Sequence, residues 1–422
     1  GVGSYEITTP EQLAGLAKMV NDGTHNFEAI KITLGADIFL NDTSGAGDGS
    51  WKNKFHRNWT PIKGFKGNFD GSAGEENHKI YGLYVNSSSS DYVGLFGSVS
   101  NARISNLDIL VGDIWGRYDV GALAGSANGG SVTNVRTEVN VNGLGDVGGL
   151  VGNSSGTILS CHVNAAVYGG LNVGGVVGYA SGLVDRSHHI GGKISGTSRI
   201  GGLVGYSTSS IENSYSEGNI IGKKTYVGGL VGYGKSVYNS HAKGSVKSDS
   251  GYVGGVAGYM TGTIDSSYYV GGEVRGFNYI GGVVGYTTSS ILNSYSKGDV
   301  TGLNDYVGGL IGGAYYNYSA SIDTSITILD NSYAIGNIQG NSYVGGLVGQ
   351  DSIYRAKNNR NHIEQIVRDS HSQGHVEGKM YVGGLIGKSC HGAKDSTYNH
   401  NFSGKIVSSY HSDGSVIGSS NY

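Results

Sequence analysis

A seven-residue signature recurs along the chain and constrains the fold more than any other feature of the sequence. It reads Tyr-Val-Gly-Gly-Leu-Val-Gly, as in residues 226–232. The first eight intervals between copies are 26 or 27 residues, and the last two are 37 and 38. A fixed period of this size is typical of a solenoid, in which each unit packs only against its neighbours. The leading glycines are Gly94, Gly121, Gly148, Gly174, Gly201, Gly228, Gly254, Gly281, Gly308, Gly345 and Gly383.

Each repeat contains three short β-rich segments, represented by residues 226–232, 211–216 and 218–222. Glycine, serine or asparagine bounds each segment, as is usual for strands. Glycine makes up 77 of the 422 residues, which disfavours helix and fits turns and close backbone approach. The sequence therefore predicts an all-β chain, folded as a right-handed parallel β-helix of about 12 coils with about 27 residues per coil.

Residues 1–91 lie outside the repeat and are predicted to form an N-terminal cap. Thr9, Pro10 and Gln12 are the start signal of a helix at 10–21, which would cover the open end of the solenoid. Residues 30–40 alternate as a strand. An aromatic cluster follows, which would seal the first coil or, alternatively, form a sugar-binding platform. It comprises Trp51, Phe55, Trp59, Phe65 and Phe69. Residues 92–422 are then the repeat domain.

Aligning the repeats gives four columns of equivalent residues. A β-branched column must point inward: Val93, Val120, Val147, Val173, Ile200, Val227, Val253, Ile280, Val307, Val344 and Val382. A small-residue column is also predicted to be interior: Leu107, Val135, Cys161, Ser187, Ser214, Ser240, Ser267, Ser294, Ser332, Ser370 and Ser409. The residue after each of these, from Asp108 to Tyr410, is expected to face solvent. A tyrosine column before the valines predicts an external ladder: Tyr226, Tyr252, Tyr279, Tyr306, Tyr343 and Tyr381.

The last three repeats carry insertions at one place in the coil, at 313–328, 350–365 and 388–405. Stacked coils would bring these loops together as one raised patch, and such clustered insertions are often binding faces. The candidate binding residues are Tyr315, Tyr316, Tyr318, Tyr354, Arg355, His362, His391, Tyr398, His400 and Phe402.

The sequence stops one residue before the next signature would begin, at Tyr422. An uncapped coil exposes backbone groups that are ready to pair. Either the polypeptide continues, or the next subunit completes the coil in a head-to-tail fibre with Tyr422 at the assembly end.

The composition and motifs give little support for catalysis or for charged partners. Only 14% of residues are charged and the net charge is −3, which disfavours nucleic acid and anionic membrane. No apolar run is long enough for a transmembrane helix. Cys161 and Cys390 would lie roughly 40 Å apart in stacked coils, too far for a disulfide. We predict no cofactor.

Two polar groupings have alternative interpretations. Cys390, His391 and His400 form a loose possible metal set, or are ordinary surface residues. Asp185 and Glu212 occupy equivalent positions in consecutive repeats, as paired catalytic carboxylates would. An exposed acidic pair of this kind is more often a solvated face, so no catalytic or metal-binding residue is predicted.

The copies at 226–232 and 343–349 resemble the GLUG motif of bacterial surface and secreted proteins. The leader also looks like the segment that introduces such repeats, through Thr9–Leu13, Trp59–Ile62 and Phe69–Gly71. The resemblance implies an extracellular β-solenoid of the kind found in adhesins, large cell-surface proteins and the non-catalytic part of some immunoglobulin-A proteases. It implies no catalytic residues.

These observations predict a non-enzymatic, extracellular structural or adhesive β-solenoid that assembles end to end or belongs to a longer surface protein. Its partners would be further copies of itself, the remainder of that protein, and glycans. The alternative is a carbohydrate-binding or polysaccharide-degrading β-helix that uses the loop patch, whose aromatic faces suit sugar rings.

Overall fold

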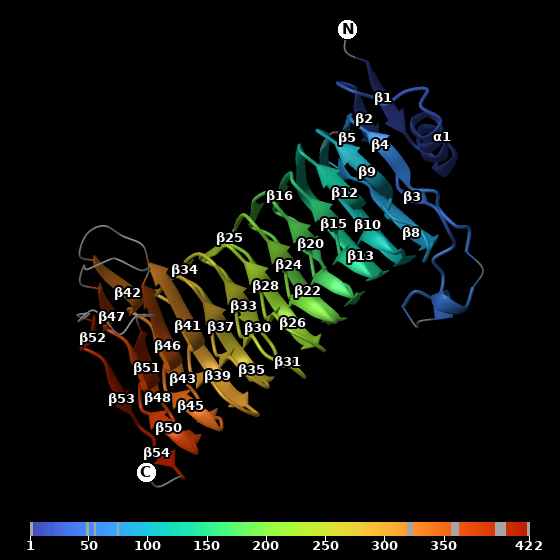
Figure 1. The fold of residues 1–422 in the computed structure, drawn as a ribbon. Helices are drawn as coiled ribbons and strands as arrows, with labels where there is room; N and C mark the ends of the chain where they lie inside the picture. Colours follow the sequence, from blue (N-terminus) through green and yellow to red (C-terminus); the bar gives the residue numbers. More distant parts are fainter. Residues whose placement is uncertain are drawn as a thin grey trace. The chain divides into compact units, whose positions relative to one another are not determined.

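The computed structural model describes residues 3–47, 50–54, 56–73, 76–318, 324–355, 363–392 and 402–419. The chain divides into two compact units, residues 1–218 and 219–422 (Figure 1). Each unit is a stack of parallel β-coils. The α-helix α1 (Pro10–Asn21) lies near the N-terminus, and a single 3-10 turn, η1 (Ser50–Asn53), follows in the cap. Within the described residues, no helix is both long and apolar enough to cross a membrane.

Each repeat folds as one coil whose strands pair in parallel with the same strands of the next coil. In unit 1, Val120 pairs with Val147 and Val147 with Val173, steps of 27 and 26 residues. In unit 2, Val227 pairs with Val253 in the same way. The predicted parallel β-solenoid with a short N-terminal helix is therefore confirmed.

The signature of each repeat contributes two strands rather than one. Val227 and Gly228 form β27, Gly229 and Leu230 turn the corner, and Val231–Gly234 form β28 in a different sheet. The first of these strands are, in unit 1, β11 (Tyr118–Gly121), β14 (Gly145–Gly148), β19 (Leu171–Gly174) and β23 (Ser198–Gly201). In unit 2 they are β27 (Val227–Gly228), β32 (Val253–Gly254), β36 (Ile280–Gly281), β40 (Val307–Gly308), β45 (Ser342–Gly345) and β50 (Met380–Gly383).

The second strand of each signature lies side by side with its counterparts (Figure 1). In unit 1 these are β9 (Phe96–Ser100), β12 (Ala124–Asn128), β15 (Val151–Ser154), β20 (Val177–Ala180) and β24 (Val204–Ser207). The strand β4 (Ile62–Phe65) of the N-terminal cap pairs with β9 in the same sheet. In unit 2 they are β28 (Val231–Gly234), β33 (Ala257–Met260), β37 (Val284–Thr287), β41 (Ile311–Tyr318), β46 (Val348–Arg355) and β51 (Ile386–Gly392).

A third sheet in each unit holds the rest of the coil. In unit 1 it includes β8 (Lys79–Asn86), β10 (Arg103–Trp115), β13 (Ser131–Asn142) and β18 (Val167–Tyr168). In unit 2 it includes β42 (Thr324–Asp330), β47 (Ile363–Arg368), β52 (Phe402–Val407), β53 (Tyr410–Ser412) and β54 (Val416–Gly418).

The glycines of the signature are required by the closeness of neighbouring coils. A Cβ on Gly149 would lie 2.2 Å from the carbonyl oxygen of Gly175, one coil further on. A Cβ on Gly255 would lie 2.1 Å from the carbonyl oxygen of Gly282. Real Cβ atoms do not approach this closely, so any side chain at these corners would force the coils apart.

The β-branched column forms the centre of the core, as predicted. Ten of its eleven members, from Val93 to Val344, are fully buried, and Val382 is partly exposed. Branched side chains are restricted in χ1 and pack well on a pleated surface, so identical residues in successive coils interlock with little loss of entropy.

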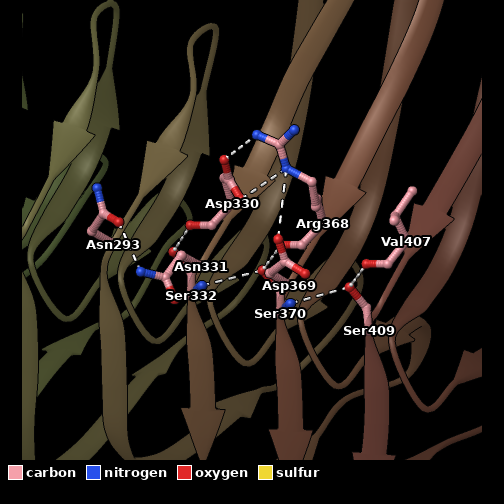
Figure 2. Close-up of polar contacts among 9 residues, drawn as sticks. All are labelled: Asn293, Asp330, Asn331, Ser332, Arg368, Asp369, Ser370, Val407 and Ser409. Carbon is pink, nitrogen blue, oxygen red and sulfur yellow. Dashed lines mark hydrogen bonds and ion pairs between the residues drawn. The ribbon is translucent and has the colours of Figure 1, made fainter.

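The serine column is also interior, and its hydroxyls link the coils (Figure 2). The Ser332 backbone N–H donates to Ser370 Oγ at 3.2 Å, and the Ser370 N–H donates to Ser409 Oγ at 3.1 Å. The Ser332 hydroxyl itself donates to the Asp330 carbonyl at 2.7 Å. Each hydroxyl therefore accepts from one coil and donates within its own, which leaves no buried polar atom of the column unpaired at this point.

The N-terminal cap begins with the predicted helix. The side chain of Thr9 accepts from the Gln12 N–H, and the side chain of Gln12 accepts from the Thr9 N–H. This reciprocal capping box and Pro10 in the first turn explain why the helix starts there. Leu13, Leu16, Ala17 and Val20 are buried. At the other end, the Asn21 side chain bonds to the backbone at Pro61 and Lys63, which ties α1 to β4.

The predicted aromatic cluster lies in the interior of the cap. Phe65 and Phe69 are fully buried, and their ring centroids lie 6.4 Å apart. Trp51 and Trp59 are also buried, and Trp59 Nε1 donates to the carbonyl oxygen of Leu95 at 3.0 Å. Phe55 lies outside the described residues. The rings that are described have no face open to solvent, which fits a seal better than a sugar platform.

Candidate functional site

The structure places the predicted binding residues at the outer ends of paired strands. Tyr315, Tyr316 and Tyr318 lie on β41, Tyr354 and Arg355 on β46, His391 on β51 and Phe402 on β52. Along the register, Tyr316 pairs with Ile353 and Ile353 with His391, while Tyr318 pairs with Arg355. The described parts of the insertions are therefore extended strands. His362, Tyr398, His400 and Tyr422 lie outside the described residues.

The tyrosine column of unit 2 forms the predicted ladder on the surface of the coils. Its members are Tyr226, Tyr252, Tyr279, Tyr306, Tyr343 and Tyr381. From Tyr252 to Tyr381, adjacent ring centroids lie 4.4–4.9 Å apart with interplanar angles of 2–8°. We call this set the tyrosine ladder.

The tyrosine ladder differs from the prediction in its backbone, because all its residues have positive φ, including Tyr343 and Tyr381, which lie within β45 and β50. Tyr226 has φ +66° and Tyr306 has φ +68°, and the other members also have positive φ. A bulky side chain is uncommon in this left-handed region. The positions form a sharp bend just before each valine, and ring stacking between coils stabilises that bend.

A second row of rings flanks the tyrosine ladder. Tyr233, Tyr259 and Tyr286 occupy equivalent positions on β28, β33 and β37. The rings of Tyr233 and Tyr259 are stacked at 4.8 Å, and Tyr279 meets Tyr286 edge-on at 5.3 Å. Burial raises the pKa of Tyr279 to about 12, with a smaller contribution from Tyr306. Its hydroxyl is therefore protonated at neutral pH, and this part of the surface is uncharged.

In the later coils of unit 2, this second row no longer contains tyrosine. Gly313 takes the position after Tyr286, and Lys388 lies two coils further along the same register. The Lys388 ammonium lies 5.0 Å from the ring centroid of Tyr343 and 4.7 Å from that of Tyr381, within cation–π range. An open hollow of about 780 Å³ borders Tyr343, Tyr381 and Val416.

The column after the serines forms another ladder, which the sequence prediction missed. Its members in unit 2 are His241, Tyr268, Tyr295, Tyr333, His371 and Tyr410, and adjacent rings lie 4.7–5.1 Å apart and almost parallel. Most of these rings are half-buried. We call this set the mixed ladder. The restriction of the column to histidine and tyrosine was the available signal, since both rings stack.

Unit 1 has carboxylates where unit 2 has the tyrosine ladder. Asp119 and Asp146 occupy this position in consecutive coils with φ +53° and +49°. Burial, followed by the charge of Asp146, raises the pKa of Asp119 to about 6. Asp146 accepts from Asn172 Nδ2 at 2.6 Å, while Asp119 Oδ1 is buried without a partner in the described structure. Burial therefore holds the pKa of both carboxyl groups above the ordinary value of an aspartate.

Asp185 and Glu212 are neighbours in register, as the sequence suggested. Asp185 accepts from Asn213 Nδ2 at 2.8 Å and forms an ion pair with Arg186 at 3.3 Å. Glu212 accepts from the Ser210 hydroxyl at 2.7 Å. Both carboxylates are thus held by local polar partners, an arrangement that fits a solvated face rather than a general acid and base.

The other reactive groups of the described structure are arranged for packing. Cys161 is fully buried, and burial raises the pKa of its thiol to about 12, which suppresses the reactive thiolate. His162 and His188 meet edge-on with ring centroids 4.0 Å apart, and burial lowers the pKa of His188 to about 4. Three or more metal-ligating side chains do not come together anywhere in the described part of the chain. The side chains of Cys390 and His391 are not among those described.

Comparisons with known proteins match the repeated part of the sequence. The GLUG motif model matches residues 196–221 and 278–301. A stretch of 164 residues, 39% of the chain, is 33% identical to Halomucin from Haloquadratum walsbyi and spans 2% of that protein's length. A solved structure of a proposed immunoglobulin A1 protease from Bacteroides ovatus is 20% identical, with a TM-score of 0.44, over 56% of this chain and 74% of that chain.

The motif matches coincide with the structural unit of the fold. Residues 278–301 run from just before β36 through β37 to β39 (Tyr295–Gly302), which is nearly one complete coil. The chain is thus a parallel β-solenoid whose coils carry GLUG motifs, as its resemblance to GLUG-repeat proteins indicates.

Proposed function

We propose that this chain is a non-catalytic structural module of an extracellular surface protein. The observation that carries the proposal is the continuity of its ladders: in unit 2 the tyrosine ladder, the mixed ladder and the serine column each run through successive coils without interruption. Residues repeated in this way stabilise a stack of coils. A catalytic centre would instead need unlike side chains that converge at one place.

The geometry of the ladders also argues against their use as sugar platforms. Stacking on a sugar requires an open ring face, but parallel rings less than 5 Å apart cover each other's faces. The edges and hydroxyls remain at the surface, so the ladders contribute a uniform, polar and uncharged exterior. The GLUG motifs and the stretch of similarity to Halomucin support a repeat module of this class.

Two measurements test the proposal: whether the chain is exposed on the cell surface, and whether it turns over any substrate. We expect brief protease treatment of intact source cells to remove an epitope in this chain while a cytoplasmic marker stays intact. We also expect the purified chain to leave polysaccharide and peptide substrates unchanged. An epitope protected until the cells are lysed, or steady turnover of any substrate that a Glu212→Gln variant lacks, would contradict the proposal.

We further propose that coils of separate copies pair end to end. The coil made by β52, β53 and β54 exposes about half of Ile406 and Ile417, and 43% of Val416. Exposed apolar side chains that lie together favour association with a surface that covers them. A second copy that supplied a coil there would cover both the side chains and the backbone groups.

A further inference from the structure

Unit 1 contains a cleft on the outer face of its third sheet. Tyr84 on β8, Asp113 on β10 and Asn140 on β13 follow one another in register. Two residues further along the same strands, Trp115, Asn142 and Tyr168 form a second row. These two rows line a hollow of about 370 Å³, within the range of small-molecule sites.

Aromatic rings form rigid walls of this cleft. His56 stacks at 4.0 Å on the buried Trp51 and lies 5.0 Å from Tyr84, and Tyr84 meets Trp115 edge-on at 5.8 Å. His56 Nε2 is also hydrogen-bonded to the Trp51 carbonyl oxygen at 3.0 Å. Trp115 and Tyr168 lie on either side of Asn142, and two strand spacings separate them by about 10 Å.

The polar groups of the cleft are held in place but retain free positions. Asn140 Nδ2 donates to Asp113 Oδ1 at 3.0 Å, and Asn140 Oδ1 accepts from the Ala166 N–H at 3.2 Å, which orients the amide and leaves one N–H. Asn142 Nδ2 is 3.5 Å from the Ile114 carbonyl oxygen, and within the described residues its Oδ1 has no partner. The Tyr84 hydroxyl accepts from Asn86 at 3.4 Å and can still donate.

This combination selects the chemical class of a ligand. An anion needs donors and a cation needs acceptors, whereas the cleft offers both: an N–H of Asn140, the O–H of Tyr84 and Oδ1 of Asn142. A sugar hydroxyl is both donor and acceptor, and the C–H face of a sugar ring packs against aromatic rings. Two charged side chains line the cleft: Lys54, which is ion-paired with Asp42 at 3.1 Å, and the buried Asp113.

We propose that this cleft binds a neutral saccharide, with the sugar ring over Asn142 between Trp115 and Tyr168. This proposal is independent of the structural role proposed above, because a non-catalytic structural module can exist with or without a glycan-binding site.

The full chain is titrated with methyl glucoside, galactose, mannose, xylose, N-acetylglucosamine and cellobiose, with saturation-transfer NMR and tryptophan fluorescence as readouts. We expect at least one of these neutral sugars to bind, and Tyr168→Ala and Asn142→Ala each to raise its Kd tenfold or more. The matched control is Tyr118→Ala, because Tyr118 is another exposed tyrosine of unit 1 that does not line the cleft.

Circular dichroism and thermal melting show whether each variant keeps the fold, and Trp115→Phe provides a conservative change if Tyr168→Ala does not fold. Glucuronate and a proline-rich peptide are titrated as competing ligand classes. The proposal is overturned if none of the neutral sugars binds, if only glucuronate or the peptide binds, or if folded cleft variants bind as tightly as the Tyr118→Ala control.

Discussion

At the residue scale, each coil depends on a side chain held in the left-handed region of the backbone. Unit 1 meets this need with Tyr92, Asp119, Asp146, Asn172 and Arg199, whereas unit 2 uses tyrosine in every coil. The aspartates and the asparagine are residue types that tolerate positive φ. The repeat predicted that the tyrosine rings of successive coils stack. It did not predict the bend in the backbone, because equivalent residues recur at the same interval whether they lie in a strand or at a corner.

Replacement of Asp119 by asparagine is expected to change how the stability of unit 1 depends on pH. In the folded protein the pKa of Asp119 is about 6, above the ordinary aspartate value of 3.8. A raised carboxyl pKa contributes stability that is fully present below about pH 4 and lost as the pH rises through about 6. Asp119→Asn should therefore gain stability relative to the wild type between pH 4 and pH 7, on the order of 1 kcal/mol after solvent screening.

Urea unfolding at pH 4, 5, 6 and 7 measures this difference. Since Asp146 also has a raised pKa from burial, the double variant with Asp146→Asn separates the two contributions. A stability difference between Asp119→Asn and the wild type that is the same at every pH would exclude the buried carboxyl as its origin.

Removal of a single hydroxyl from the serine column is expected to be costly. Ser332→Ala removes the acceptor of the Ser294 N–H at 3.0 Å and the donor to the Asp330 carbonyl oxygen at 2.7 Å. A buried N–H left without a partner costs about 1–3 kcal/mol. The exposed Ser419 supplies the control, and Ser419→Ala should change the free energy of unfolding by less than about 0.5 kcal/mol. Equal effects of the two changes would argue against a role for the hydroxyl.

At the element scale, the sequence predicted structures that depend on neighbouring residues of the chain. It did not predict structures that depend on contact with the next coil. The helix at 10–21 was predicted because Thr9, Pro10 and Gln12 act on their own first turn. The signature was read as one strand, but the corner at Gly229 and Leu230 divides it between two sheets. That corner is set by contact with the next coil, where a Cβ on Gly229 would meet Gly255 O at 2.0 Å.

Two glycine-to-alanine changes in unit 1 separate the effect of a steric clash on stability from the effect of backbone flexibility. Gly149→Ala should destabilise the protein by more than about 2 kcal/mol, since its Cβ would lie 2.2 Å from backbone and 2.6 Å from Val163. Gly15→Ala, on an exposed and open position of α1, should stabilise it by up to about 1 kcal/mol. Thermal melting compares the two, and a Gly149→Ala protein as stable as the wild type would mean that neighbouring coils are not packed as closely as described.

At the scale of the whole molecule, the repeat predicted the fold class and the residues of the interior. The proposed saccharide cleft is instead formed by residues that do not recur in the repeat. The saccharide cleft depends on Tyr84, Asp113, Trp115 and Tyr168, which have no equivalents in the signature and come from coils of different composition. Periodicity carries no information about such residues. Only the register of the strands shows that they lie on one face.

At the same scale, a single substitution can test the proposed end-to-end pairing of separate copies. Ile417→Lys places a charge on β54, where half of the isoleucine side chain is exposed. Lysine at an open edge opposes strand addition, because pairing would have to desolvate the ammonium. We expect wild-type protein to form larger species as its concentration rises, and the variant to remain monomeric in analytical ultracentrifugation. The control is Ile221→Lys, which charges a comparably exposed isoleucine away from the last coil. If both variants associate like the wild type, the last coil is not an assembly surface.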